Sequence, residues 1–258
     1  MRIVIKIGTS TLTYATGNLH IRHVETLCKV ISDLKNAGHQ IILVSSGAIG
    51  MGTGKLGLSE RPKDMPTKQA AAAVGQCELM YFYDKLFSEY NHTVGQILIT
   101  GSDLDNAERT RNFRNTVERL LALRVLPIIN ENDTVATEEI AVGDNDTLAA
   151  IVATVASADL LILLSDIDGL YTADPHKHPD ARLISHVTEI SDEIIALAGG
   201  AGSALGTGGM KTKLSAARLC TDNGTDMVIA NGADPALLYG IVDGEPIGTR
   251  FHKKASNT

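Results

Sequence analysis

Short apolar runs alternate along the chain with longer stretches in which apolar residues recur every three or four positions. The short runs are rich in Val and Ile and span four to seven residues, which is typical of β-strands, whereas the longer stretches have the period of amphipathic α-helices. The predicted strands are 2–7, 40–45, 94–100, 125–129, 159–164 and 226–230, and the predicted helices are 21–37, 68–90, 109–123, 147–158 and 210–223.

Several of these strand runs are apolar throughout, without alternation. Such strands are buried on both faces, as in parallel sheets that helices cover from both sides. The repeated strand–helix–strand order therefore predicts an α/β fold with a right-handed, doubly wound sheet. We expect one domain, residues 1–258, whose two lobes meet near residues 140–175.

Small and polar side chains follow four of the predicted strands. These segments are Lys6-Ile7-Gly8-Thr9-Ser10, Ser45-Ser46-Gly47-Ala48, Asn130-Glu131-Asn132-Asp133 and Ser165-Asp166. In doubly wound sheets ligands bind at the carboxyl ends of the strands. One binding site built from these four segments is therefore expected.

Lys6 stands inside an otherwise apolar strand. Burying a lysine there is costly unless it meets a negative charge. The alternative is an edge-strand lysine that points at solvent. Because Gly8 and two hydroxyl residues follow, the backbone can approach a phosphate closely, and we favour a role in binding.

A glycine-rich turn, Gly206-Thr207-Gly208-Gly209-Met210-Lys211-Thr212-Lys213, leads into the last predicted helix. The N–H groups of a helix start suit phosphate, but an ordinary surface loop is the alternative. The turn is not a Walker A loop, since Gly-x-x-x-x-Gly-Lys-Ser/Thr does not occur in the chain. Lys211 and Lys213 lie about 200° apart around a helix, so they cannot both face one phosphate.

A second glycine pattern, Gly52-x-Gly54-x-x-Gly57, matches the dinucleotide-binding fingerprint. That fingerprint requires its glycines directly after a strand and an acid at the end of the next strand. Here several residues intervene, and the acid near the required spacing, Glu78, lies in a predicted helix. The match is therefore rejected.

The motifs Asn130-Glu131-Asn132-Asp133-Thr134 and Val142-Gly143-Asp144-Asn145-Asp146 together hold four acids and three asparagines. Three interpretations stay open. Asp146 could simply cap the helix that follows. The acids could bind Ca²⁺, although the spacing of an EF-hand is missing. The cluster could also hold the ammonium group of an amino acid and order nearby lysines.

Composition narrows the class of protein. The 258 residues are 44% hydrophobic but only 4% aromatic, without Trp, so the core must be aliphatic. A net charge of −7 argues against a nucleic-acid or anionic-membrane surface, and no apolar stretch is a credible membrane span. The three separated cysteines, Cys28, Cys77 and Cys220, predict buried free thiols in a reducing cytosol. The eight dispersed histidines give no Ser-His-Asp or Cys-His set.

Six motifs resemble, in the same order, those of the glutamate 5-kinases in the amino acid kinase superfamily. They are the segments that begin at Val4, Ser45, Ile129, Val142, Gly169 (Gly169-Leu170-Tyr171-Thr172-Ala173-Asp174-Pro175) and Gly206. Acetylglutamate kinase, aspartokinase and uridylate kinase share the first and last of them, so a sister specificity is one alternative. A non-catalytic amino-acid sensor on the same fold is another.

The resemblance implies a three-layer αβα sandwich with a mainly parallel central sheet. It implies a lobe of about residues 1–155 for the amino acid, a lobe of about 156–258 for the nucleotide, and a short form without a PUA domain. The implied reaction is ATP- and Mg²⁺-dependent phosphorylation of the γ-carboxylate of L-glutamate to L-glutamyl 5-phosphate, the first step of proline biosynthesis. A cytoplasmic homo-oligomer, dimer or tetramer, that hands its product to glutamyl phosphate reductase is expected, without nucleic-acid or membrane partners.

The resemblance also implies roles for individual residues. Lys6 contacts the phosphoryl oxygens, Lys213 stabilises the transition state and Asp146 orients both lysines. Glutamate is held by Ser46, Asn130, Asp133, Asp144 and Asn145. ATP is held by Lys6, Gly8, Ser165, Asp166, Thr207, Gly208, Gly209, Met210, Lys211, Thr212 and Lys213. No residue is assigned as a metal ligand. A carboxylate acceptor is ionised at neutral pH, so the reaction needs no general base.

Overall fold

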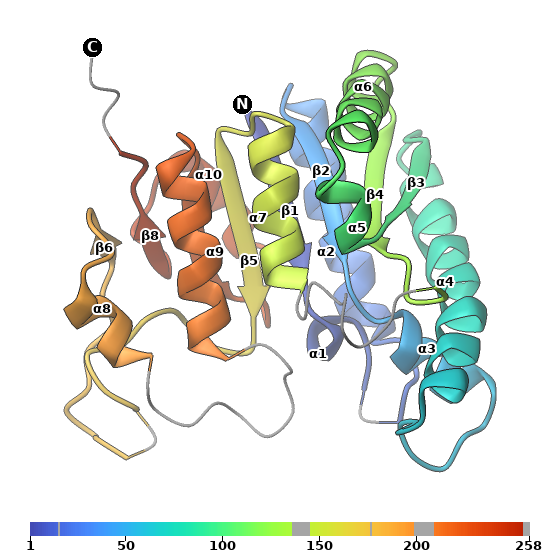
Figure 1. Ribbon diagram of the computed structural model, residues 1–258, viewed down its shortest axis with the longest axis horizontal. Helices are drawn as coiled ribbons and strands as arrows, with labels where there is room; N and C mark the ends of the chain where they lie inside the picture. Colours follow the sequence, from blue (N-terminus) through green and yellow to red (C-terminus); the bar gives the residue numbers. More distant parts are fainter. Residues whose placement is uncertain (15, 136–144, 176, 199–208, 255–258) are drawn as a thin grey trace.

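The computed structural model describes residues 1–14, 16–135, 145–175, 177–198 and 209–254 (Figure 1). In these residues eight strands form one sheet in the order β3-β4-β2-β1-β5-β7-β8-β6. The strands are β1 (Arg2–Ile7), β2 (Gln40–Ser45), β3 (Val94–Ile99), β4 (Leu126–Glu131), β5 (Leu160–Ser165), β6 (His186–Val187), β7 (Asp226–Asn231) and β8 (Thr249–Phe251). All neighbours pair in parallel except β7 and β8.

Helices cover both faces of this sheet (Figure 1). They are α1 (Thr9–Leu12), α2 (Ile21–Asn36), α3 (Ala48–Lys55), α4 (Met65–Ser88), α5 (Gly101–Leu104), α6 (Ala107–Ala122), α7 (Asn145–Val155), α8 (Asp192–Leu197), α9 (Met210–Asp222) and α10 (Leu237–Asp243). One hydrophobic core joins the sheet to α6, α7 and α9, and a second joins it to α2, α4 and α10. The expected three-layer α/β sandwich with a mainly parallel sheet is confirmed.

Strand β1 shows how the chain places Lys6. Ile3, Ile5 and Ile7 belong to the core beneath α2 and α4, whereas Val4 belongs to the core beneath α7 and α9. Side chains alternate between the two faces of a strand, so Lys6 lies on the side of α7 and α9. Because β1 lies between β2 and β5, the interpretation of Lys6 as an edge-strand residue is wrong.

All six predicted strands and five predicted helices are present, with ends within three residues of those expected. The elements that the pattern did not predict are short or rich in glycine. β6 and β8 have two and three residues, which is too few for a periodicity to show. α3 contains three glycines, which have low helix propensity.

Gly52, the first glycine of the rejected dinucleotide pattern, lies where α3 and α4 touch through their backbones. A Cβ atom at Gly52 of α3 would lie 1.8 Å from the carbonyl oxygen of Ala71, and one at Gly75 of α4 would lie 1.8 Å from that of Ala48. No side chain can occupy either position without moving the helices apart. Close packing of α3 against α4 therefore accounts for Gly52 and Gly75.

Gly52→Ala is expected to lower the free energy of unfolding by about 2–3 kcal/mol, because the added methyl group must push α4 away. Gly50→Ala, two positions earlier in α3, is the matched control. Its Cβ would meet two side-chain atoms and no backbone, the methyl group of Thr9 at 3.3 Å and Thr13 Oγ1 at 3.6 Å. Alanine also favours a helix over glycine by about 1 kcal/mol. Urea unfolding of both variants measures the difference, and equal losses of stability would contradict the backbone contact.

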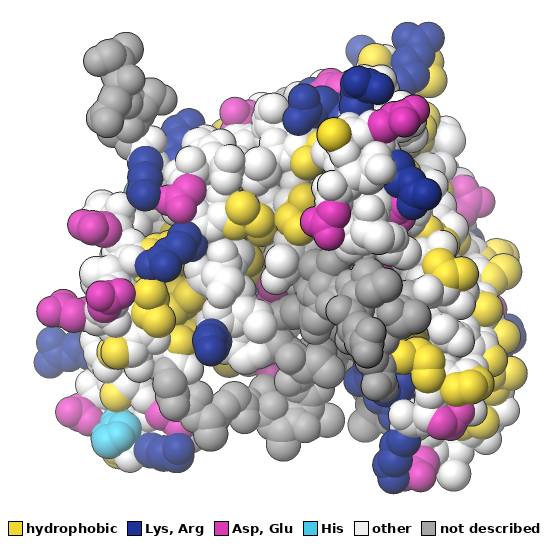
Figure 2. Space-filling view, viewed as in Figure 1, with side chains coloured by type: hydrophobic (Ala, Val, Ile, Leu, Met, Phe, Trp, Pro, Cys, Tyr) yellow, Lys and Arg dark blue, Asp and Glu magenta, His cyan; other side chains and the backbone are white. Residues whose placement is uncertain are grey.

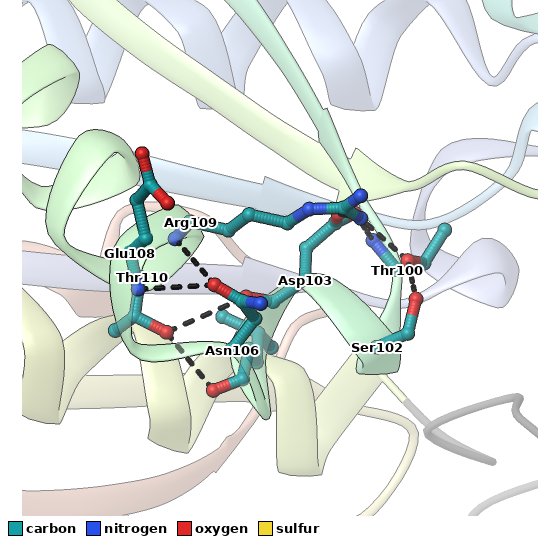
Figure 3. A network of polar contacts seen from close by, with 8 residues as sticks. Thr100, Ser102, Asp103, Asn106, Glu108, Arg109 and Thr110 are labelled. Carbon is teal, nitrogen blue, oxygen red and sulfur yellow. Dashed lines mark hydrogen bonds and ion pairs between the residues drawn. The ribbon is translucent and has the colours of Figure 1, made fainter.

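A network of polar side chains connects β3 to α6 (Figure 3). Thr100 and Asp103 form a capping box at the start of α5, and the Asn106 side chain accepts from the backbone N–H groups of Glu108 and Arg109 at the start of α6. Arg109 then pairs with Asp103 at 2.7 Å. The capping contacts satisfy several of the N–H groups that two successive helix starts leave unpaired.

Three further features concern exposed side chains, the cysteines and the helix lengths. Figure 2 shows hydrophobic side chains gathered on the side of the molecule where α4 and β3 lie. Tyr81 of α4 is exposed. Cys28 and Cys220 are buried as expected, but Cys77 is exposed on α4, so the prediction of three buried thiols is wrong for this one. Among the described residues, none of the helices is long and apolar enough to cross a membrane.

Candidate functional site

One buried carboxylate bridges two lysines from distant parts of the chain. Lys6 Nζ lies 2.6 Å from Asp146 Oδ1, and Lys213 Nζ lies 2.9 Å from Asp146 Oδ2. Their side chains are 9%, 6% and 1% exposed for Lys6, Lys213 and Asp146. β1, α7 and α9 supply one residue each, and Figure 1 shows α7 and α9 in front of β1 and β5. The three residues expected to carry the chemistry therefore form one cluster.

The charges of this cluster do not cancel. Two ammonium groups and one carboxylate leave one positive charge in a place with little water, where it attracts an anion more strongly than at the surface. Burial alone would raise the pKa of Asp146, but the attraction of Lys6 and then Lys213 outweighs burial and holds that pKa below its ordinary value. Asp146 is therefore ionised at neutral pH and holds both lysines near a common point.

The structure decides two questions that the sequence left open. α7 begins at Asn145, so Asp146 lies in the first turn of the helix, and its side chain faces the lysines. The interpretation of Asp146 as the cap of this helix is therefore wrong. Lys211 is exposed whereas Lys213 is buried, in agreement with the expectation that the two lysines point in different directions.

Amide and hydroxyl groups gather directly beside this cluster. The Asn145 Nδ2 group donates to Ser46 Oγ at 2.7 Å, to Asn130 Oδ1 at 3.1 Å and to the carbonyl oxygen of Ser45 at 3.3 Å. β2, β4 and α7 thus bring Ser46, Asn130 and Asn145 together next to Asp146. Three of the five residues expected to hold the amino acid therefore share one network.

Asp133, the fourth of these five, follows β4 in a turn. Burial raises its pKa, and the nearby Arg61 partly offsets this effect. Asp144, the fifth, lies outside the described residues.

The residues expected to bind the nucleotide flank the lysines. A Cβ atom added to Gly8 would lie 3.8 Å from both Lys6 Nζ and the carbonyl oxygen of Leu164, so Gly8 adjoins the lysine and the end of β5. At that end Ser165 Oγ donates to Asp166 at 3.1 Å. Gly209, the residue before α9, makes no side-chain cap, and the N–H groups of a helix start suit an anion.

The remaining nucleotide residues lie in or just before α9. Thr212 Oγ1 donates to the carbonyl oxygen of Gly209 at 2.8 Å, and Met210 is half-buried. Thr207 and Gly208 lie outside the described residues. Among the described residues, no group of three or more His, Cys, Asp or Glu side chains could hold a metal ion.

Gln76 is a site residue that the sequence did not indicate. It lies on the buried face of α4 and accepts a hydrogen bond from Asn130 Nδ2 at 3.0 Å. The one available signal was a glutamine in an alanine-rich helix, which by itself suggests no particular contact.

Known proteins resemble this chain at the levels of family, sequence and fold. The model of the "Amino acid kinase family" matches residues 1–231. A "Glutamate 5-kinase" of Clostridium tetani is 55% identical over 250 residues, covering 97% of this chain and 94% of the relative, and one of Clostridium perfringens is 52% identical over 257 residues, covering 98% and 96%.

Solved structures share the fold at low sequence identity. The carbamate kinase from Giardia lamblia bound to AMP-PNP has a TM-score of 0.69 at 17% identity and covers 98% of both chains. The UMP kinase from Ureaplasma parvum has a TM-score of 0.67 at 16% identity, again with 98% of both chains covered. The fold, the paired lysines and these matches place the chain in the amino acid kinase family. Within that family it belongs with the glutamate 5-kinases.

Proposed function

We propose that this chain transfers the terminal phosphoryl group of ATP to the γ-carboxylate of L-glutamate, which gives L-glutamyl 5-phosphate, the first committed product of proline biosynthesis. The observation that carries the proposal is the buried Lys6–Asp146–Lys213 cluster beside the amides of Asn130 and Asn145. A cationic centre suited to phosphate thus adjoins amide groups suited to an amino acid, as the kinase family and the relatives' names lead one to expect.

The reaction brings two anions together. The acceptor carboxylate is already ionised at neutral pH, so no base is needed, and catalysis depends on position and on stabilisation of charge. Lys6 and Lys213 hold ammonium groups at the two oxygens of Asp146, so both can meet the oxygens of one phosphoryl group. We propose that Lys6 contacts these phosphoryl oxygens and that Lys213 stabilises the transition state. Asp146 orients the two lysines.

The two substrates would approach this centre from opposite sides. On the side of residues 1–155, Ser46, Asn130, Asp133, Asp144 and Asn145 would hold glutamate. On the side of residues 156–258, Ser165, Asp166 and residues 207–213 would hold ATP, with Gly8 and Lys6 between the two. This division retains the two lobes expected from the resemblance.

Mg²⁺ fits the donors at the end of β5. This ion is usually bound by substrate phosphates, water and one or two carboxylates, and it would neutralise charge on the phosphates of ATP. Asp166, exposed beside the Ser165 hydroxyl, has the required chemistry. We assign Asp166 as the carboxylate that would hold Mg²⁺ together with ATP.

We also propose a cytoplasmic homo-oligomer. The sheet edge at β3 and the hydrophobic side chains gathered there over α4 suit contact with a second copy (Figure 2). The product is an acyl phosphate, which water hydrolyses readily, so hand-over to a glutamyl phosphate reductase would protect it.

Incubation of the protein with ATP, Mg²⁺, L-glutamate and hydroxylamine is expected to give γ-glutamyl hydroxamate, because hydroxylamine traps the acyl phosphate. Omission of ATP is the control. N-acetylglutamate in place of glutamate is expected to give much less product, since a free ammonium group is needed to meet Asp133. Folded protein that binds glutamate without forming hydroxamate would instead support an amino-acid sensor.

A further inference from the structure

The amides that are proposed to hold glutamate continue, through Gln76, into helix α4. We propose that Gln76 is a positioning residue: it determines which atoms of Asn130 and Asn145 face the substrate. The inference rests on the proposed function and adds to it a residue outside the substrate pocket. Its basis is the direction of each hydrogen bond in the network.

The direction at Asn130 follows from a backbone group. The N–H group of Glu131 lies 2.9 Å from one atom of the Asn130 amide, and because an N–H group can only donate, this atom must be the oxygen. The nitrogen then lies on the opposite side of the amide. There it donates to Gln76 Oε1 at 3.0 Å, so Gln76 must present its acceptor.

A second backbone group determines the direction at Asn145. The carbonyl oxygen of Ser45 can only accept, so the amide atom of Asn145 at 3.3 Å from it must be the nitrogen. The same nitrogen donates to Asn130 Oδ1 at 3.1 Å. The donors of Asn145 are thus turned towards the protein, and its oxygen lies on the other side of the amide, where it suits a donor such as the α-ammonium group of glutamate.

Burial makes Gln76 decisive for this arrangement. Gln76 and Asn130 are only 8% and 2% exposed, so water is poorly placed to replace a lost acceptor. Without that acceptor, Asn130 Nδ2 would stay unpaired. If the amide turned over instead, its nitrogen would face two donors, the Glu131 N–H group and Asn145 Nδ2. Either change would disturb the amides that face glutamate.

The other end of the network is weaker. Gln76 Nε2 lies 3.5 Å from Gln96 Oε1, a long contact to an exposed residue of β3. The acceptor of Gln76, rather than its donor, therefore carries the proposed role. The variants that test the proposal therefore differ in whether residue 76 keeps a hydrogen-bond acceptor.

Gln76→Met removes the acceptor at similar size and is expected to raise KM for glutamate at least about tenfold, within the range for one buried donor left unpaired, while KM for ATP changes less than about twofold. Gln76→Glu retains an acceptor in either protonation state and is expected to restore most of the affinity for glutamate. Gln76→Asn, too short to reach Asn130, should behave as Gln76→Met does and replaces it if that variant does not fold.

Two further variants are controls. Leu79→Ala, on the same buried face of α4, should lower the thermal midpoint without changing the ratio of the two KM values. Gln96→Ala should leave both KM values unchanged. Active wild-type protein together with a Gln76→Met variant that has normal KM for glutamate, or equal increases in both KM values, would overturn the role of Gln76. Wild-type protein that forms no hydroxamate would overturn the proposed function itself.

Discussion

Lys213→Ala is expected to lower kcat by about 10²–10³-fold or more, the cost of losing one group that stabilises charge in a transition state. Lys213 shares the carboxylate of Asp146 with Lys6, so its removal takes the charge of the cluster from plus one to zero. The protein should stay folded, because Asp146 retains Lys6 as its partner. Initial rates of hydroxamate formation measure the change in kcat, and a thermal melt shows whether the variant is folded.

The control for this variant is Arg218→Ala, which removes a cation from the exposed face of the same helix. Its rate should stay within about twofold of the wild type. A Lys213→Ala protein with nearly normal kcat would show that the transition state does not depend on this ammonium group.

Asp146→Asn is expected to lower the free energy of unfolding by about 3–5 kcal/mol and to abolish measurable activity. Asparagine has almost the same shape, so no cavity forms, but the buried carboxylate with which both ammonium groups pair is lost. The matched control is Asp222→Asn, which breaks a pair of exposed side chains, Asp222 and Lys254, that lie 2.7 Å apart. A surface pair of this kind contributes about 0–1 kcal/mol.

The loss of stability in Asp146→Asn should depend on pH. The pKa of Asp146 is lower in the folded protein than in the unfolded chain, so its stabilising effect is present above the ordinary aspartate range. That effect is lost as the pH falls through the folded-state pKa. Urea unfolding at neutral and acid pH should therefore show the two proteins converging in acid, and a constant difference would contradict the assigned ion pairs.

The regular part of the fold could be predicted because strands such as β1 and β2 are long, apolar and buried on both faces. The elements that the sequence pattern did not predict are too short, or too rich in glycine, to show a hydrophobic periodicity. α3 is a helix in spite of three glycines, and one of them, Gly52, lets it touch α4 through a contact between residues distant in the sequence.

The residues of the site could be named from the sequence, but their contacts could not. The resemblance to a known family named Lys6, Asp146 and Lys213, but nothing in their spacing showed that one carboxylate would hold both lysines. The alternative role of Asp146 as a helix cap failed because α7 starts at Asn145, two residues earlier than its pattern suggests. Gln76 could not be predicted, since its importance comes from hydrogen-bond directions set by backbone groups of two other strands.

The sheet order has a consequence for how the protein is made. β1 is the first strand to leave the ribosome, and in the folded protein it lies in the middle of the sheet, between β2 and β5. One of its edges must wait for a partner more than a hundred residues away in the chain, as in the pairing of Ile3 with Leu160. Such distant pairings slow folding and leave an apolar strand open to association with other chains. We therefore expect newly synthesised molecules to need protection from aggregation until β5 has emerged.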